Sequence, residues 1–215
     1  MFKNAINIGT KNSLALLKDI KSVSSFYLAG GTALSLQMGH RISYDLDFFT
    51  QEVFDTDKLL KSLNEVFKLH DVILTDGSLR GFTDDCEISF FLYQYPLVNK
   101  KEVYDGIFLA SIKDIALMKI IAIGSRGARK DFYDLYFILK NCYSITDLFD
   151  AFPKKFGQND LNEFHYIKSL TFFELADADD TKINLVPRSS GPKTTTSNVS
   201  WNEVKSFLKE QSKLL

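Results

Sequence analysis

The first half of the chain alternates short apolar runs with segments of helical periodicity. Helices are predicted at residues 13–23, 32–38 and 57–69, where apolar residues recur every three or four positions. Strands are predicted at the apolar runs 26–29, 45–49, 72–75, 86–95 and 107–110. This alternation predicts helices packed on a sheet, so we assign residues 1–110 to one α/β unit.

From residue 111 onward the pattern is helical. Residues 111–123 and 129–139 carry apolar residues at helical spacing, and two or three further helices are expected around 144–151, 161–175 and 200–212. Residues 184–198 are rich in Pro, Ser, Thr and Gly, which predicts a flexible loop. Within it, Leu185-Val186-Pro187-Arg188 resembles an engineered protease-cleavage sequence, so no function is assigned to this segment.

Composition and charge are those of an ordinary globular protein. The chain has 215 residues, of which 45% are hydrophobic and 25% charged, and its net charge is −1. This balance excludes a strongly basic nucleic-acid coat protein but not a local basic site. No apolar run approaches the ~20 residues of a membrane span, and no signal peptide is expected. Cys86 and Cys142 form neither a disulfide framework nor a metal-ligand spacing, so a cytoplasmic protein is expected.

A glycine turn, Gly30-Gly31, ends the apolar run of residues 26–29 and precedes a helix expected to open at Thr32. Glycine lets the backbone approach a ligand closely, and the N–H groups of a helix start attract anions. The Thr32 hydroxyl would add a further donor to such a phosphate site. Many strand-to-helix turns use glycine without binding anything, so the turn alone leaves both interpretations open.

Two carboxylates, Asp45 and Asp47, follow at i and i+2 on a predicted strand. This spacing places both on one face, while Leu46 and Phe48 point to the other. Converging carboxylates repel each other unless a cation lies between them, and Mg²⁺ typically takes one or two carboxylates plus substrate phosphates. A lone Asp-x-Asp is equally consistent with solvated aspartates, but the glycine turn upstream favours a site for a nucleoside triphosphate.

Together these residues match a known signature. Gly-Gly-Thr, a spacer and Asp-x-Asp are typical of the polymerase-beta-like nucleotidyltransferases. The string from Leu28 to Phe49 closely resembles the AbiEii/AbiGii toxin family of that superfamily. Residues 111–119 and 126–136 resemble the second conserved block of the family, so the resemblance covers residues 20–141.

The resemblance implies both a fold and a reaction. The fold is the α+β nucleotidyltransferase fold, in which a mixed β-sheet flanked by helices (residues 1–110) is joined by a helical region (residues 111–215) that completes the active site. The reaction moves a nucleoside monophosphate from a nucleoside triphosphate, such as ATP, to a hydroxyl acceptor with Mg²⁺ or Mn²⁺, and releases pyrophosphate. The biological role implied is the toxin of a bacterial toxin–antitoxin or phage-defence pair, with a tRNA 3′ end as acceptor and a cognate antitoxin as partner.

Several positively and negatively charged residues become candidates for this site. Lys119 falls within the apolar stripe of its helix, where a lysine either reaches a partner or extends to solvent. Asp131 and Asp134 share a helical face and either pair with nearby Arg and Lys side chains or border the active site, as the resemblance implies. Arg41 and Lys113 are candidate phosphate contacts, and each is also explained as a surface side chain.

The third carboxylate of this superfamily is uncertain here. It normally comes from a neighbouring strand, and Glu87 is the acid within the predicted strand 86–95. The acid of the family aligns either with Glu87, a candidate metal ligand, or with Ser89. In the second case Asp131 or Asp134 substitutes for it, or activity is weakened.

Two other functions remain open from the sequence. One is a nucleotidyltransferase that modifies a protein or a small molecule. The other is a catalytically silent nucleotide-binding module, which the uncertain third carboxylate allows.

Overall fold

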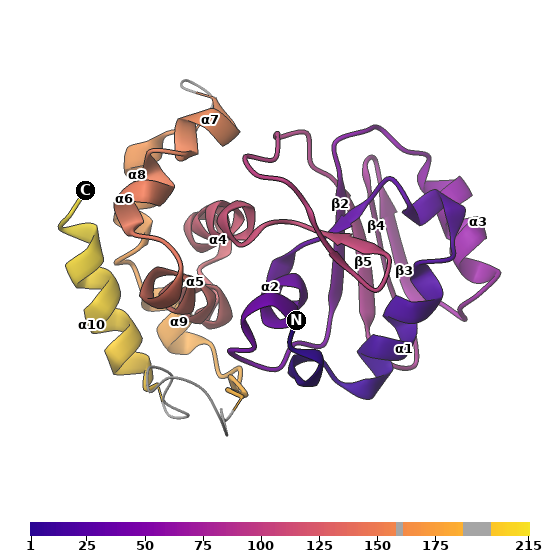
Figure 1. Ribbon diagram of the computed structural model, residues 1–215, viewed down its shortest axis with the longest axis horizontal. Coiled ribbons are helices and arrows are strands. Elements are labelled where there is room, and N and C mark those ends of the chain that lie inside the picture. The colour runs from indigo at the N-terminus through magenta and orange to yellow at the C-terminus, as the bar shows by residue number, and fades with distance from the viewer. Residues whose placement is uncertain (158–160, 187–198) are drawn as a thin grey trace. The chain divides into compact units, whose positions relative to one another are not determined.

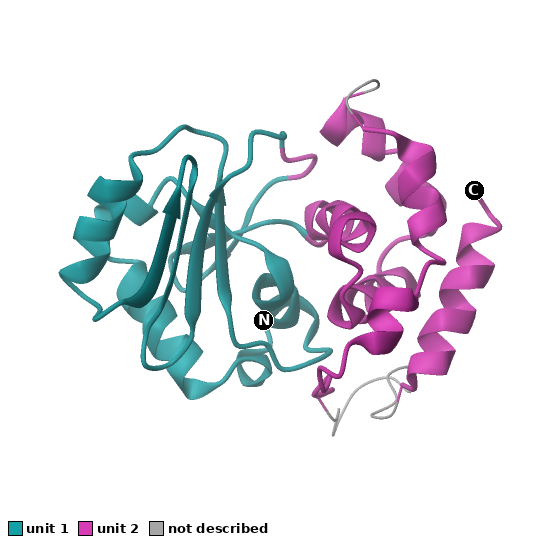
Figure 2. Cartoon of the chain, turned by 180° about the vertical axis from the view of Figure 1, so that it is seen from behind, with its two compact units in different colours: residues 1–96, 100–111 teal, residues 97–99, 112–215 magenta. Residues whose placement is uncertain are grey.

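The computed structural model describes residues 1–157, 161–186 and 199–215. The chain divides into two compact units (Figure 2): unit 1 comprises residues 1–96 and 100–111, and unit 2 comprises residues 97–99 and 112–215. Of the loop predicted over residues 184–198, residues 187–198 lie outside the described ranges.

Within the described residues, unit 1 contains a mixed seven-stranded sheet, and the α+β class predicted from the sequence is confirmed. The strands are β1 (Tyr27–Leu28), β2 (Leu46–Thr50), β3 (His70–Thr75), β4 (Ser78–Phe82), β5 (Glu87–Leu92), β6 (Glu102–Tyr104) and β7 (Ile107–Leu109), in the order β3-β4-β5-β2-β1-β7-β6. β2 pairs in parallel with β5 and antiparallel with β1. The sequence pattern does not predict β4 or β6, because β4 includes the polar Arg80 and the small Gly81 and β6 has only three residues.

Three α-helices accompany the sheet: α1 (Ile8–Leu17), α2 (Gly30–Met38) and α3 (Thr56–Asn64). α2 lies beside β2, and α3 lies beside the outer strands β3 and β4 (Figure 1). α1 begins five residues before its prediction because Asn7 caps it, with Oδ1 accepting from Thr10 N at 2.6 Å. It also ends earlier, so Ile20 is buried from the turn after the helix rather than from the helix itself.

The central strands β2 and β5 divide their side chains between the two faces of the sheet. Four side chains on one face are at most 1% exposed: Leu46, Phe48, Ile88 and Phe90. The rings of Phe48 and Phe90 stack with centroids 5.1 Å apart. Asp47 and Ser89 alternate with these residues and therefore point to the opposite face, which we call the carboxylate face.

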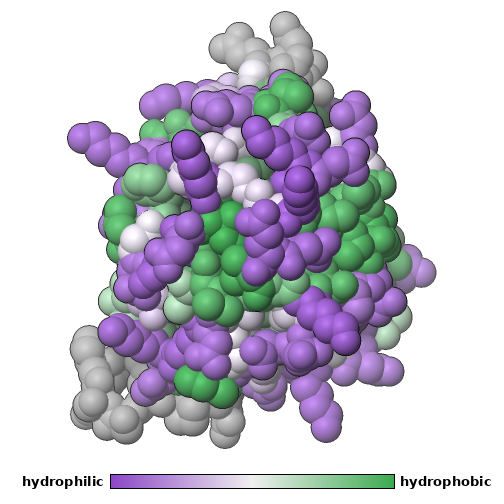
Figure 3. Space-filling model, turned by 90° about the vertical axis from the view of Figure 1, so that its right-hand side faces the viewer, coloured by the Kyte–Doolittle hydropathy of each residue, from purple (hydrophilic) through white to green (hydrophobic). Residues whose placement is uncertain are grey.

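The edge strand β3 is largely exposed to solvent. Ile73 is 56% exposed and Leu74 36%. The side of unit 1 that carries α3 shows apolar surface among charged side chains (Figure 3). Charged neighbours of this kind limit edge-to-edge association between copies of a sheet.

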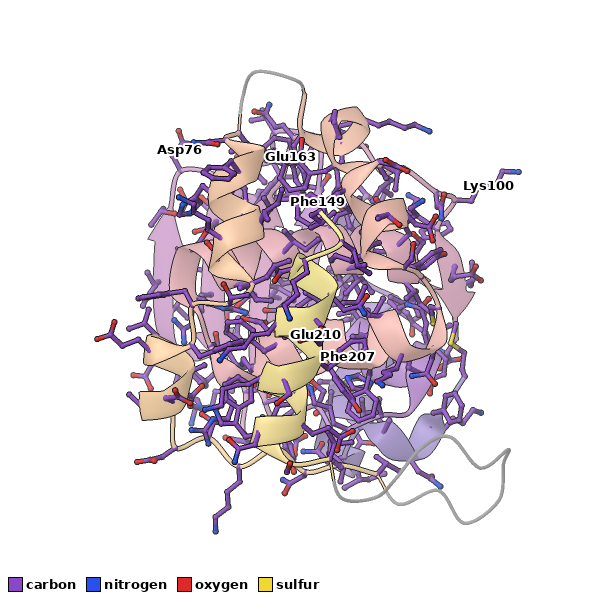
Figure 4. The ribbon with its side chains drawn as sticks, turned by 90° about the vertical axis from the view of Figure 1, so that its left-hand side faces the viewer. Asp76, Lys100, Phe149, Glu163, Phe207 and Glu210 are labelled. Atoms are coloured by element: carbon purple, nitrogen blue, oxygen red, sulfur yellow. The ribbon has the colours of Figure 1, made fainter. Side chains whose placement is uncertain are left out.

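The regular secondary structure in the described residues of unit 2 is mainly helical. Its helices are α4 (Ile112–Arg126), α5 (Arg129–Asn141), α6 (Ile145–Phe149), α7 (Phe152–Phe156), α8 (Glu163–Ser169), α9 (Glu174–Ala178) and α10 (Trp201–Ser212). The single helix expected around residues 161–175 is thus two short ones. α10 carries Phe207 (Figure 4), whose ring lies 5.1 Å from that of Tyr136 on α5. No helix in the described ranges is long and apolar enough to cross a membrane.

A buried carboxylate fixes the start of α4. Asp114 is fully buried and accepts hydrogen bonds from the backbone N–H groups of Val98 and Asn99 at 2.8 and 3.2 Å. It also pairs with the Lys155 ammonium at 2.8 Å. Burial lowers the pKa of Lys155, and the hydrogen bond and charge of Asp114 partly offset that effect. Residues 97–99 belong to unit 2 through these contacts.

Candidate functional site

The glycine turn follows β1 in unit 1 and forms the start of α2, which begins at Gly30, two residues before the expected Thr32. Gly30 has a φ of +64°, a conformation that residues with side chains rarely adopt. A Cβ at Gly30 would lie 2.6 Å from Asp47 Oδ2, so glycine lets this carboxylate approach the start of α2. The N-cap residue of α2, Ala29, makes no side-chain cap hydrogen bond, and the N–H groups of a first helical turn attract anions.

Arg41 places its guanidinium against the same turn. A Cβ at Gly31 would overlap with Arg41 Nη2 and would lie 3.1 Å from Ser43 Oγ. Arg41 is only 6% exposed, and its Nη1 donates to the Ile42 carbonyl at 3.2 Å. The predicted phosphate contact is therefore held beside the glycine turn and does not extend into bulk solvent.

Thr32 connects α2 to the loop before β2. Its side chain is buried, its hydroxyl donates to the Asp45 carbonyl, and its Oγ1 lies 2.9 Å from Ser43 Oγ. The hydroxyl that the sequence suggests for a phosphate thus has a structural partner. A phosphate contact from Thr32 would come from its backbone N–H.

The two aspartates lie at the start of β2. Asp45 immediately precedes the strand and Asp47 is its second residue, and both are half-buried. The Asp47 carbonyl accepts a hydrogen bond from Ala29 N at 2.9 Å. This bond and the close approach at Gly30 hold the Asp47 carboxylate at the glycine turn.

The neighbouring strands add a third acid and a cation. Asp47 lies opposite Ser89 of β5, and Ser89 lies opposite Arg80 of β4. Glu87 accepts from Arg80 Nε and from Arg80 Nη2, the latter at 3.0 Å, and from the Ser89 hydroxyl at 3.2 Å. The hydrogen bond and charge of Glu87, with smaller contributions from Asp45 and Asp47, raise the pKa of Arg80.

These residues fit a metal ion that takes some of its ligands from the protein and the others from the phosphates of a nucleotide. Among the described residues, no group of three or more His, Cys, Asp or Glu side chains is arranged to hold a metal. Asp45 and Asp47 supply the one or two carboxylates that Mg²⁺ takes when substrate phosphates provide the remaining ligands. The space a Cβ would fill at Gly30 adjoins Asp47 Oδ2 directly, so such phosphates could approach this carboxylate.

A second charged cluster lies in unit 2, between α4 and α5. The Lys119 ammonium is 2.7 Å from Asp131 Oδ1 and 2.6 Å from Asp134 Oδ2. The lysine side chain is 5% exposed and neither carboxylate side chain is exposed at all. The structure therefore brings together Lys119, Asp131 and Asp134, which are the candidate residues from the second family block. The lysine pairs with these carboxylates and does not extend to solvent.

Arg126 completes this cluster from the end of α4. Its Nε donates to Asp131 Oδ2 at 2.8 Å and its Nη2 to Oδ1 at 3.0 Å. Burial acts to raise the pKa of Asp131, but the charge of Lys119 and the hydrogen bond and charge of Arg126 outweigh it. The pKa of Asp131 therefore lies below its ordinary value, and this carboxylate is ionised at neutral pH.

The other basic residues of this region also have partners. Arg129 donates from Nε to the Ala176 carbonyl at 2.8 Å and from Nη2 to the Asp177 carbonyl at 3.1 Å. Lys113 lies near the start of α4, with its ammonium 5.5 Å from the centre of the Tyr143 ring. Much of the basic charge in residues 113–129 is thus engaged within unit 2.

Comparison with known families identifies the chain. The model of the nucleotidyl transferase AbiEii toxin family, from type IV toxin–antitoxin systems, matches residues 15–85 and 94–208. This chain belongs to the AbiEii family. An uncharacterised protein of Aquifex aeolicus (strain VF5) is 35% identical over 195 residues, which are 88% of this chain and 87% of the relative.

The family match extends well beyond the resemblance noted in the sequence. That resemblance covers residues 20–141, whereas the AbiEii model continues to residue 208, within α10. The short helices and most of α10 are therefore part of the AbiEii pattern, a relationship that their local sequence does not reveal.

Solved structures confirm the nucleotidyltransferase fold of this AbiEii chain. JHP933 from Helicobacter pylori aligns with a TM-score of 0.54 at 19% identity and covers 97% of this chain and 92% of its own. MenT4, the nucleotidyltransferase toxin Rv2826c of Mycobacterium tuberculosis H37Rv, aligns with a TM-score of 0.50 at 14% identity. This alignment covers 96% of this chain and 84% of the MenT4 chain. Family and fold together identify the AbiEii protein as a nucleotidyltransferase enzyme.

Two polar residues near the AbiEii motif were not predicted from the sequence as residues of the site. Ser43 packs beside Gly31 and Thr32, and Arg80 binds Glu87 from a strand that the pattern does not predict. Ser43 lies within the family string and could have been noticed there. Arg80 becomes visible only through the pairing of β4 with β5.

Proposed function

We propose that this AbiEii-family enzyme transfers a nucleoside monophosphate from ATP or another nucleoside triphosphate to the 3′ end of a tRNA. It would act as the toxin of a bacterial toxin–antitoxin or phage-defence pair, in the cytoplasm, with a cognate antitoxin as partner. The observation that carries the proposal is the approach of Asp47 Oδ2 to the glycine turn. This approach brings an anion-binding helix start and a metal-binding carboxylate together at one point.

The residues of unit 1 have distinct roles in this proposal. The first-turn N–H groups at Gly30, Gly31 and Thr32 bind the β- and γ-phosphates, and Arg41 adds a fixed positive charge beside them. Asp45 and Asp47 would hold Mg²⁺ or Mn²⁺, which when bound neutralises the charge developing on the phosphates. Fixing both substrates here supplies much of the rate enhancement through proximity.

The reaction itself is a balanced substitution at the α-phosphorus. The acceptor oxygen forms a bond to the α-phosphorus while the bond from that phosphorus to the bridging oxygen breaks. Pyrophosphate leaves, and the proton of the acceptor hydroxyl is released to solvent. The rigid placement of Asp47 between Ala29 N and Gly30 means that little reorganisation is needed when the nucleotide binds.

Lys119, Asp131 and Asp134 are retained as catalytic candidates of unit 2, as the family resemblance implies. Lys119 balances the charge of both buried carboxylates, and removal of the lysine takes this cation away from both of them. Lys113 is retained as a phosphate contact from α4. Glu87 is retained as a metal ligand that Arg80 holds in the absence of nucleotide.

The decisive experiment incubates the purified protein with Mg²⁺, each α-labelled triphosphate in turn and total bacterial RNA, followed by a denaturing gel. We expect label on a tRNA-sized band, and the reactive triphosphate identifies the base. In Asp47→Asn we expect labelling to fall at least about 100-fold, because one of the two carboxylates that would hold the metal ion is lost. The melting temperature should stay close to that of the wild type, since Asp47 is only half-buried.

Asp76→Asn is the matched control, because Asp76 is an exposed aspartate in the turn between β3 and β4. This variant should label tRNA like the wild type. Label on protein or on a small molecule instead of RNA would replace the proposed acceptor. Turnover retained in Asp47→Asn would exclude the metal role of this carboxylate.

A further inference from the structure

Arg80 is an exposed arginine on the carboxylate face with unused donors. Its side chain is 49% exposed although its guanidinium pairs with Glu87. That pair uses the edge formed by Nε and Nη2, which is two of the five N–H donors of a guanidinium. Three donors remain for another group, and a planar guanidinium of this kind matches a phosphate.

Strand register places Arg80 in the same row as Asp47. Asp47 pairs with Ser89 and Ser89 with Arg80, so all three side chains point to the carboxylate face. With neighbouring strands about 5 Å apart, the Arg80 backbone lies about 10 Å from that of Asp47. The effect of Asp45 and Asp47 on the pKa of Arg80 agrees with this proximity.

The order of the strands separates Arg80 from the glycine turn. β1, which leads into the turn, lies on one side of β2, whereas β5 and then β4 lie on the other. In the proposed function the triphosphate binds at the turn. The phosphate that reaches Arg80 therefore comes from the second substrate.

We propose that Arg80 binds a backbone phosphate of the acceptor RNA and so positions its terminal hydroxyl at Asp47. This assignment rests on the proposed function, because it requires an acceptor that carries phosphodiesters. The nucleotide and the acceptor then approach Asp47 from opposite sides of β2. Glu87 keeps the guanidinium oriented when no RNA is bound.

The test measures binding without turnover, using fluorescein-labelled tRNA and, separately, a fluorescent ATP analogue. Arg80→Ala should weaken tRNA binding about tenfold and reduce the slope of log affinity against log salt by about 0.7, as for one lost phosphate contact. Binding of the ATP analogue should stay within about twofold of the wild type, because the turn is unchanged. In turnover assays the same variant should raise KM for tRNA but not for the triphosphate.

Three variants separate a phosphate contact from a structural role. Arg80→Lys keeps the charge and should recover most of the tRNA affinity. Glu87→Gln removes the negative charge that pairs with Arg80 and should maintain or increase tRNA affinity, whereas a merely structural ion pair predicts the same loss as Arg80→Ala. Lys100→Ala removes an exposed positive charge outside the row and should leave tRNA binding unchanged.

The outcomes distinguish this assignment from the proposed function. If the wild type labels and binds tRNA but Arg80→Ala binds it equally well, the Arg80 assignment is wrong and the function stands. If Arg80→Ala loses affinity for both probes equally, Arg80 belongs to the nucleotide site. If the wild type binds the ATP analogue but not tRNA, the tRNA acceptor is wrong, and the Arg80 assignment is overturned with it.

Discussion

At the scale of single residues, the site depends on a glycine that no other residue can replace without a steric cost. Gly30 combines a positive φ with direct approach to Asp47 Oδ2. The first property affects only the backbone, whereas the second affects the position of a proposed metal ligand. The chain offers a way to separate them, because Gly106 has a φ of +85° but only Lys18 Cδ, at 3.9 Å, near its Cβ position.

We expect Gly30→Ala and Gly106→Ala to lose about 1 kcal/mol of stability each from the left-handed backbone. Gly30→Ala should in addition lose most of its transferase activity, because the new Cβ displaces Asp47. Urea unfolding and the labelling assay measure the two effects. Equal activity in both variants would contradict the role given to the close approach.

At the scale of helices, ion pairs fix how α4 and α5 pack. Lys119 lies in the buried face of α4 and meets Asp131 and Asp134 of α5, and Arg126 adds two hydrogen bonds from the end of α4. Removal of Lys119 would leave two buried carboxylates without its charge, which is strongly destabilising. Arg126 is the better probe, since its side chain is 57% exposed.

Arg126→Met should lower the free energy of unfolding by about 1 kcal/mol at pH 7, given its partial exposure. Arg126 lowers the pKa of Asp131 in the folded protein. The ion pair therefore contributes fully to stability above the pKa of an unfolded aspartate, about 3.9, and this contribution is lost as pH falls through the lower pKa of Asp131 in the folded protein. The difference between wild type and variant should therefore shrink as pH falls below about 4. Urea unfolding across this range measures it.

Lys130→Met is the control for charge, because it removes the positive charge next to Asp131 in sequence, whereas Lys119 and Arg126 are the residues that lower the pKa of Asp131. Its stability should follow the wild-type pH dependence. If the difference in unfolding free energy between wild type and Arg126→Met stays the same in acid, the effect comes from the packing of the Arg126 side chain and not from the Asp131 carboxylate.

At the scale of the whole chain, positive and negative charges nearly cancel. Lys and Arg number 26 against 27 Asp and Glu. Lys119, Arg126 and Arg129 are engaged within unit 2. An RNA acceptor would therefore be bound through a few local contacts, not through a general positive field.

We accordingly expect a shallow salt dependence for tRNA binding, with a slope of log affinity against log KCl of roughly −1 to −3. Fluorescence anisotropy between low and moderate KCl measures this slope. A slope steeper than about −5 would indicate many phosphate contacts and would contradict the local mode of binding.

The sequence by itself determined the features that depend on neighbours along the chain. The alternation of apolar runs predicted the α+β class, and the spacing of Asp45 and Asp47 predicted two acids on one face of a strand, of which Asp47 lies in β2 and Asp45 immediately before it. Gly30-Gly31 predicted the turn that follows β1, where α2 begins. The class and the turn follow from the sequence because periods of 2 and 3.6 residues and glycine turns are local properties of the chain.

Only the tertiary structure decided which side chains meet across the sheet and between helices. The pairing of β4 with β5 places Arg80 in the row of Asp47, and the packing of α4 on α5 gives Lys119 its two carboxylate partners. The closeness of Asp47 to Gly30 likewise depends on the pairing of β1 with β2. Cross-strand register and burial arise from contacts between distant segments, which no local pattern of residues specifies.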